Sequence, residues 1–497
     1  MLFKNLDSLI AAVIGMTGVL LLTQHGGVGI SPDSIYYISA SHSLMAGNGF
    51  MQFDDSPFVL FPLIYPSFLA LIEYIFRTDI VVLAPYINAC LFGVTIFLSS
   101  SMLEKMKLLK WVKWIILLLI ALSAGLLEIY TMLWSETLFI TEIIIFIWCC
   151  FYYFKNSTLK NLWGVACIAA LAADTRLAGV TVIITGGLLI VLLRELKGIK
   201  KWNHFFIYSL VSSSLLTINL VRNFLVATSF TGARQKGDTP ILMNVKYFGE
   251  VIGDWFSLSK ISNFSPLFFG LIFIFLLSAI SIYRYSKKIE HNSFEKISAC
   301  FTWVYLMFML LSATFSKYEA INNRLLAPFF IPVLFTVGFY SISFIEWVKK
   351  PKLKYLISTL IALAGFFIIY NYYNGVVTTH QQNKEGGIGG YGEDDWLYSD
   401  LLLSVQKDSS CFIQGIPVYA NASHAVYFYT KRHLSILPET KHVKQLQEFY
   451  ELPQNILIWL TNEDNPAIET LDAIKIHKNL TVIKQYKDGF IFLCTPK

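Results

Sequence analysis

The sequence predicts an all-α polytopic membrane domain followed by a small α/β domain on the extracytoplasmic side. Hydrophobic residues make up 55% of the 497 residues, and the mean hydropathy is +0.57. Many apolar runs approach the roughly 20 residues that cross a bilayer. After residue 375 the composition changes, and short β-prone runs alternate with helical stretches. We therefore predict a transmembrane domain at 1–375 and an extracytoplasmic domain at 376–497.

About eleven spans follow from the apolar runs and the basic loops between them. These loops lie at 104–113, 155–160, 194–201, 284–296 and 349–354, and the positive-inside rule places them in the cytoplasm with the N-terminus. Because basic loops flank it on both sides, the run 162–193 must cross twice, with its outer bend at 174–176. The spans are expected at 9–23, 80–102, 111–127, 133–154, two within 162–193, 205–226, 264–283, 297–315, 325–345 and 355–373. An odd count leaves the C-terminal domain outside.

One apolar stretch, 58–76, is assigned to the membrane surface. If it crossed, the lysines at 105–113 would reach the wrong face. Pro62 and Pro66 suit the start of a helix, and Glu73 fits a boundary better than a bilayer centre. We therefore expect an interfacial or re-entrant helix from Pro62 to Phe76.

The last 120 or so residues are typical of a small α/β domain. A glycine-rich linker or loop is expected at 386–392. Strands are expected at 411–413, 416–419, 456–460, 481–483 and 490–494, and helices near 394–405, 424–430 and 443–450. Cys411 and Cys494 form either a disulfide or two free thiols.

The predicted topology gathers polar outliers on the external side. They are Asp33, His42, Asp54, Asp55, Glu136, Asp174, Arg176, Arg222, Arg234, Lys236, Lys317, Glu319 and Arg324. Charges that share one face at the membrane edge imply a common polar cavity; solvated loop charges are the alternative. Arginine binds phosphate oxygens through a bidentate fork, but an ion pair with a nearby carboxylate explains it equally well.

Asp33 stands out because it follows the first apolar run directly, within the segment 31–37. A carboxylate at a membrane boundary suits a general base that accepts a proton from an acceptor. The structural alternative is an N-cap or first-turn role in the helix that Pro32 begins.

Other catalytic patterns are missing from the sequence. It contains no H-E-x-x-H, Walker or G-x-S-x-G motif. It also contains no metal-ligand spacing and no nucleic-acid-binding signature. ATP-driven work and nucleic-acid partners are therefore not expected.

Several motifs, taken in order, resemble the GT-C superfamily of integral-membrane glycosyltransferases, which includes protein O-mannosyltransferases, aminoarabinose transferases of lipid A and bacterial relatives. The motifs lie at 32–37 with 46–49, 61–66, 134–139, 175–179, 222–223 with 231–234, 323–328, and 418–427 with 437–438. The resemblance implies interfacial helices in the first external loop and a polyprenyl-phosphate sugar donor. It also implies a single inverting displacement with Asp33 as the catalytic base and arginine stabilising the departing phosphate.

On this reading, the remaining polar outliers and two tyrosines take binding roles. Substrate-binding residues are expected to be Tyr37, His42, Asp54, Asp55, Tyr65, Glu136 and Arg176. Donor-phosphate-binding residues are expected to be Arg222, Arg234, Lys236 and Arg324. No cofactor is predicted; a divalent cation stays open because Asp54-Asp55 is not a clear D-x-D pair. The expected partners are the donor, membrane lipids and a lipid, glycan or protein acceptor, at a bacterial inner (cytoplasmic) membrane.

The alternative function is transport or polymerisation of polyprenyl-linked glycans. A transporter, flippase or polymerase of polyprenyl-linked glycans predicts charged residues deep within spans and access from both faces. The gathering of polar outliers on one face, together with the external domain, favours the transferase.

Overall fold

The structure is a computed structural model that describes residues 6–193, 196–232, 235–262, 264–286, 293–317, 319–463 and 465–497. The chain forms two compact units. The first contains 1–24, 59–65 and 81–381, and the second contains 25–58, 66–80 and 382–497. The predicted boundary near residue 375 stays a prediction.

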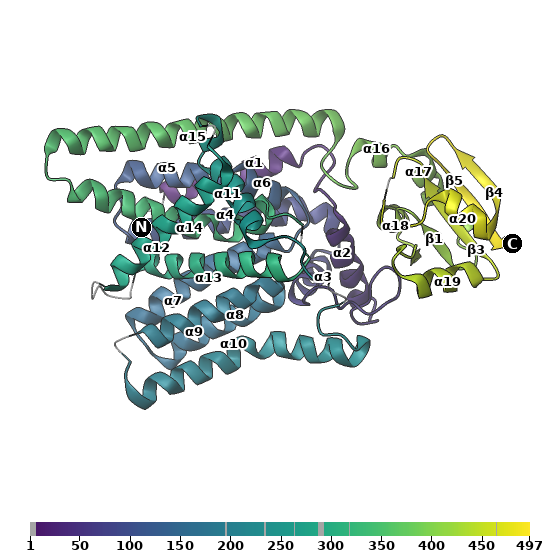
Figure 1. The fold of residues 1–497 in the computed structure, drawn as a ribbon, viewed down its shortest axis with the longest axis horizontal. Coiled ribbons are helices and arrows are strands. Elements are labelled where there is room, and N and C mark those ends of the chain that lie inside the picture. The colour runs from purple at the N-terminus through teal and green to yellow at the C-terminus, as the bar shows by residue number, and fades with distance from the viewer. Residues whose placement is uncertain are drawn as a thin grey trace. The chain divides into compact units, whose positions relative to one another are not determined.

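The first unit is helical (Figure 1). Its helices are α1 (Leu6–Leu22), α4 (Ile80–Lys105), α5 (Lys110–Ala121), α6 (Ala124–Thr131), α7 (Glu136–Lys155), α8 (Leu159–Thr175), α9 (Val180–Leu192), α10 (Gly198–Ala227), α11 (Ile241–Trp255), α12 (Pro266–Ser286), α13 (Phe294–Phe315), α14 (Asn323–Trp347) and α15 (Pro351–Gly386). A helix lies at each place where a span is predicted. Helix α11 was not predicted.

Membrane crossing is supported by helix length for part of this set. Among the described residues, α4, α7, α10, α13, α14 and α15 are long and apolar enough to span, and α5 with α6, bent by 43°, makes a seventh candidate. Helix α1, the run 177–192 and the first 17 residues of α12 are apolar but shorter. The protein is a multi-pass membrane protein; the count of eleven and the orientation stay predictions.

The break between α8 and α9 falls at the predicted bend. Arg176 is extended (φ −147°, ψ 143°) and ends α8. A Cβ at Gly179 would lie 2.1 Å from the carbonyl oxygen of Ala172. Only glycine lets the chain fold back this closely, so the local sequence determines where Arg176 sits.

The second unit combines the first loop with the C-terminal α/β domain. Its helices are α2 (Pro32–Met45), most of α3 (Ile64–Phe76), α16 (Asp394–Leu397), α17 (Asp400–Lys407), α18 (Ser423–Thr430), α19 (Val443–Glu451) and α20 (Leu471–His477). Its strands are β1 (Val418–Ala420), β2 (Ser435–Ile436), β3 (Asn455–Leu460), β4 (Lys478–Tyr486) and β5 (Gly489–Pro496). The 13 residues of α3 extend about 20 Å, less than the roughly 30 Å of a bilayer core.

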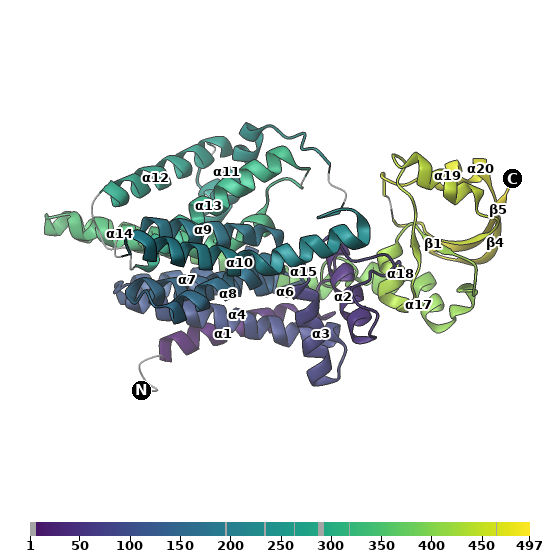
Figure 2. The ribbon, with the colours of Figure 1, turned by 90° about the horizontal axis from the view of Figure 1, so that it is seen from below.

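The five strands form one sheet in the order β2-β1-β3-β5-β4. Strand β1 is parallel to β2 and β3, whereas β5 is antiparallel to β3 and β4. Figure 2 shows α19 and α20 on one side of the sheet and α17 and α18 on the other. On the first side, Phe449 and Ile474 pack with Leu457 and Phe492, which are register partners.

One strand prediction for this domain is corrected, and two short elements were missed. The strand predicted at 411–413 is wrong: a 3₁₀ turn at Ser409–Cys411 and irregular backbone occupy it. Strand β2 and helix α20 were missed because β2 has two residues and α20 has seven, too few to show a periodicity. The disulfide alternative is settled: Cys411 and Cys494 are free and buried.

The glycine-rich segment is an ordered loop in contact with the first loop. Tyr391 N–H donates to the Ile30 carbonyl (2.7 Å), and Ile30 N–H donates to the Gly389 carbonyl (3.2 Å). Gly390 has φ +74°, and a Cβ there would lie 2.1 Å from the Ile30 oxygen. Close backbone approach, rather than flexibility, explains this glycine.

Candidate active site

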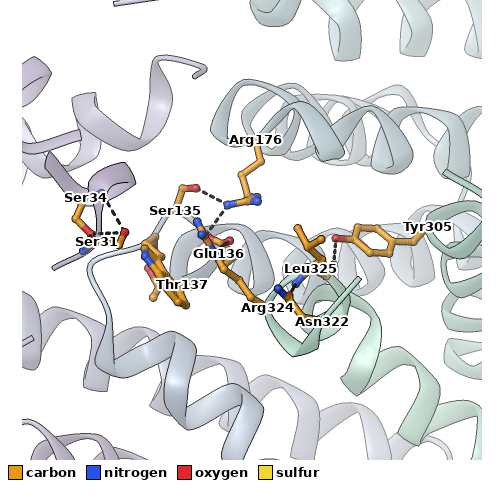
Figure 3. A network of polar contacts seen from close by, with 11 residues as sticks. Ser31, Ser34, Ser135, Glu136, Thr137, Arg176, Tyr305, Asn322, Arg324 and Leu325 are labelled. Atoms are coloured by element: carbon orange, nitrogen blue, oxygen red, sulfur yellow. Dashed lines mark hydrogen bonds and ion pairs between the residues drawn. The ribbon is translucent and has the colours of Figure 1, made fainter. Parts of the chain in front are cut away.

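In the first unit a buried carboxylate lies between two arginines (Figure 3). Arg324 Nε donates to Glu136 Oε1 at 2.6 Å, and Arg176 Nη1 lies 2.5 Å from Glu136 Oε2. The Glu136 side chain is fully buried, whereas those of Arg176 and Arg324 are 19% and 16% exposed. The hydrogen bond orients the Arg324 guanidinium, whereas Arg176 and Oε2 form an ion pair without a hydrogen bond in the described part of the chain.

Three helix ends bring these side chains together. Glu136 is the first residue of α7, Arg176 follows the end of α8, and Arg324 lies in the first turn of α14. The Asn322 side chain caps α14 by accepting from Leu325 N–H (3.1 Å). Ser135 completes the setting, because its hydroxyl accepts from Arg176 at 2.8 Å.

The cluster carries more positive than negative charge. The side chains of Glu136, Arg176 and Arg324 by themselves have a formal charge of +1, and the Glu128 carboxylate also interacts electrostatically with Arg324. The Arg324 guanidinium also lies 4.1 Å from the centroid of the Trp134 ring, in cation–π geometry. An anion with several oxygens is the ligand that such partly exposed guanidinium groups recognise.

More polar groups are buried in the same unit. Asn219 donates to Asp174 Oδ1 (2.9 Å), and Thr175 donates to Glu142 Oε1 (3.0 Å). Glu142 was missed as a site residue, although an acid inside the predicted span 133–154 was the signal that could have found it. These bonds fix the last two residues of α8, which directly precede Arg176.

In the second unit, Asp33 occupies the first turn of α2. The helix is capped by Ser31: Ser34 N–H donates to Ser31 Oγ (3.4 Å), and Ser31 N–H donates to Ser34 Oγ (3.0 Å). Of the two structural roles considered for Asp33, the N-cap is therefore wrong, and the first-turn position is the one that the structure has. Its half-buried carboxylate lies at the N-terminal end of the helix.

An aromatic cluster follows Asp33 by one turn. The Tyr36 ring lies 5.6 Å from Phe53 and 5.2 Å from His424, and His424 lies 6.5 Å from Tyr391. Burial, with the charges of Asp54 and Asp33, raises the pKa of Tyr36 to about 12. Sequence reasoning missed this cluster because its members come from three distant parts of the chain.

The other predicted substrate-binding residues are dispersed. Tyr37 and Tyr65 are each only 1% exposed and belong to packed interiors. Asp54 accepts from Ser56 N–H and Oγ (3.0 and 2.6 Å). The remaining two each lie beside a partner: Asp55 lies 2.8 Å from His433, and His42 lies 3.5 Å from Glu73.

Among the predicted phosphate-binding residues, only Arg324 belongs to the charged cluster within the described part of the chain. Arg222 donates to Asn223 Oδ1 at 3.0 Å. Lys236 is exposed, and its backbone pairs with Ser316. Arg234 lies outside the described residues.

The fold resembles those of solved membrane proteins. The crystal structure of ArnT from Cupriavidus metallidurans in the apo state matches with a TM-score of 0.57 and 11% identity over 97% of this chain and 96% of that one. ArnT bound to undecaprenyl phosphate matches with a TM-score of 0.53 and the same identity and coverage. The archaeal oligosaccharyltransferase AglB from Archaeoglobus fulgidus, in complex with an inhibitory peptide and a dolichol-phosphate, matches with a TM-score of 0.54 and 11% identity over 92% of this chain and 70% of that one.

These likenesses confirm the GT-C fold that the sequence motifs predicted. No protein-family model matches the sequence, and no curated protein matches it.

His424 gives a prediction for stability. Burial lowers its pKa from 6.5 to about 4, and its buried Nε2 has no hydrogen-bond partner in the described part of the chain. Between pH 4 and pH 6.5, His424 is therefore protonated in the unfolded chain but neutral in the folded protein. The stabilisation is present above pH 6.5 and is lost as the pH falls towards 4, by roughly 3 kcal/mol in all.

The measurement is thermal unfolding of the detergent-solubilised protein between pH 4 and pH 7. His424→Phe keeps an aromatic ring and should flatten the difference in that window. His433→Ala, which removes a half-exposed imidazole of the same unit, is the control variant. Parallel curves for His424→Phe and wild type would assign the pH dependence to other groups.

Proposed function

We propose that this protein is a glycosyltransferase that moves a sugar from a polyprenyl-phosphate donor to an extracytoplasmic acceptor. The observation that carries the proposal is the pair of partly exposed guanidinium groups held by the buried Glu136. The fold supports it, because ArnT was solved with undecaprenyl phosphate and AglB with a dolichol-phosphate. We place the protein in a bacterial cytoplasmic membrane.

The proposed reaction is one inverting displacement. The Asp33 carboxylate accepts the proton of the acceptor hydroxyl, whose oxygen attacks the anomeric carbon of the donor sugar. The bond from that carbon to the phosphate oxygen breaks, and polyprenyl phosphate leaves with the electron pair. A general base of this kind contributes roughly 10²–10⁴-fold to the rate.

In this scheme Arg176 and Arg324 bind the departing phosphate. Glu136 orients both of them and keeps two guanidinium groups from repelling each other. Preorganised donors of this kind stabilise charge as it develops, without reorganising at the moment of reaction. Arg222 and Lys236, which do not contact Glu136 in the described structure, are assigned at most a peripheral role in attracting the anionic lipid.

Arg324→Ala is expected to weaken use of the donor. A charge-assisted hydrogen bond contributes about 1.5–3 kcal/mol, so kcat/KM for the lipid-phosphate sugar should fall about 10–100-fold. Arg324→Lys keeps the charge but loses the fork, and should recover only part of the loss. Initial rates in proteoliposomes, at varied donor concentration, provide the measurement.

The control is Lys246→Ala, which removes a half-exposed cation 4.0 Å from Glu250 in the same unit. It should keep wild-type donor kinetics. Unchanged kinetics in Arg324→Ala would assign this arginine to structure alone.

Comparing envelope glycolipids and glycoproteins by mass spectrometry, with and without the protein, identifies the acceptor. Transbilayer flux of a labelled lipid-linked sugar without any transfer product would overturn the transferase proposal.

A further inference from the structure

A second group of potential ligands lies within the second unit, apart from the residues used above. It contains one ligand atom from each of His42, Glu73 and Asp79, and these atoms all lie within 4.8 Å of one another. Among the described residues no other group of three histidine, cysteine or acidic side chains meets this criterion. The cluster joins the last turn of α2, the last turn of α3 and the residue before α4.

We propose that these three side chains bind a divalent transition-metal ion, with zinc as the best fit. Imidazole nitrogen and carboxylate oxygen are both ligand types that zinc accepts. Bonds of about 2.0–2.2 Å in a tetrahedron place neighbouring ligand atoms about 3.3 Å apart. His42 Nε2 and Glu73 Oε1 are 3.5 Å apart, so this edge already has the required length.

The state of Glu73 supplies an independent reason. Its side chain is only 13% exposed, and its Oε2 is buried without a hydrogen-bond partner in the described part of the chain. Leaving a carboxylate oxygen desolvated and unsatisfied is costly. A metal ion bound to Oε1 would neutralise the negative charge that Oε1 and Oε2 of Glu73 share.

Without a metal, His42 contacts Glu73 and Lys431 pairs with Asp79. Lys431 Nζ lies 3.8 Å from Asp79 Oδ2, and both side chains are 41% exposed. A half-exposed ion pair at this distance contributes little to stability. A metal ion can therefore replace Lys431 as the partner of Asp79. By contrast, the half-exposed His433 pairs with the exposed Asp55 at 2.8 Å in the same unit, and in the described structure no third ligand joins them.

A metal here would tie the end of α2 to α3. Helix α2 has 14 residues and carries Asp33 at its other end, so the proposed role is structural and positioning. The inference concerns metal binding itself. It therefore stands or falls separately from the proposed glycosyl transfer.

The test is zinc binding by the full-length protein in detergent, after chelator treatment. Competition against a chromogenic zinc chelator should show one more equivalent in the wild type than in His42→Ala or Glu73→Gln. His433→Ala should match the wild type. The difference between variants removes any background from the seven cysteines. Cobalt(II) gives a second readout, because its visible absorption reports tetrahedral coordination.

Lys431→Ala sharpens the test. Removing the competing ammonium should leave the zinc affinity unchanged or tighten it, whereas weaker binding would contradict the proposed ligand set. Zinc should also raise the unfolding temperature of the wild type but not that of Glu73→Gln. Equal zinc stoichiometry in the wild type, His42→Ala and Glu73→Gln would overturn the proposal, even if one variant were poorly folded.

Discussion

Asp33→Asn is expected to abolish sugar transfer, with a loss of about 10²–10⁴-fold in kcat. Asparagine matches aspartate in size and keeps a polar group in the first turn of α2, but it cannot accept a proton at neutral pH. The helix itself should persist, because Ser31 caps it. Transfer assayed in proteoliposomes with the purified variant measures the effect.

A matched change separates chemistry from structure at this helix. Ser31→Ala removes the cap and should cost about 1 kcal/mol of stability, with far less effect on kcat than Asp33→Asn. Circular dichroism and unfolding temperature should show Asp33→Asn to be as folded as the wild type. If Asp33→Asn transfers sugar at the wild-type rate, the assignment of the base is wrong.

Glu136→Gln should produce the largest combined loss of stability and activity. Removing one partner of a buried ion pair typically costs about 3–5 kcal/mol, and here it leaves two guanidinium groups without the carboxylate between them. We expect the lower end of that range, because the arginines are 19% and 16% exposed and water reaches them. Thermal unfolding in detergent, together with donor kinetics, reports both effects.

A double-mutant cycle tests the reason for this loss. Once Arg176 is removed, losing the Glu136 carboxylate should cost less stability. The double variant Glu136→Gln, Arg176→Met should therefore lose less unfolding free energy than the sum of the losses in the two single variants. Glu104→Gln is the control for removing a carboxylate from an ion pair. Its partner Lys113 also contacts Asp7 at 2.6 Å, so Lys113 keeps a carboxylate partner and the loss of stability should be smaller. Additive effects in the cycle would show that Glu136 does not act through Arg176.

The sequence was a good guide wherever the cause is local. Long apolar runs form helices because backbone groups must bond internally in lipid, and helices lie at every predicted span. The bend at 174–176 was also predicted, because basic loops flank the run 162–193 on both sides. The structure adds that Gly179 permits the turn. In the C-terminal domain β3 and β5 were found, because each has at least six residues with a clear β pattern.

Pairings across the chain were beyond such reasoning. The sequence left each arginine as either a phosphate ligand or a member of an ion pair. Arg324 and Glu136 are 188 residues apart, and only the meeting of helix ends selects this pair from many candidate charges. The same reason hides the contact of Tyr36 with His424 and the group formed by His42, Glu73 and Asp79.

By itself the sequence determined that this is a multi-pass helical membrane protein with an α/β appendage, because hydropathy and side-chain period are properties of neighbouring residues. The tertiary structure alone decided that Glu136 is shared by two arginines, that Ser31 rather than Asp33 caps α2, and that Tyr37 and Tyr65 are buried. The physical reason is that partner choice and burial depend on how distant elements pack, and packing is not encoded in any one segment.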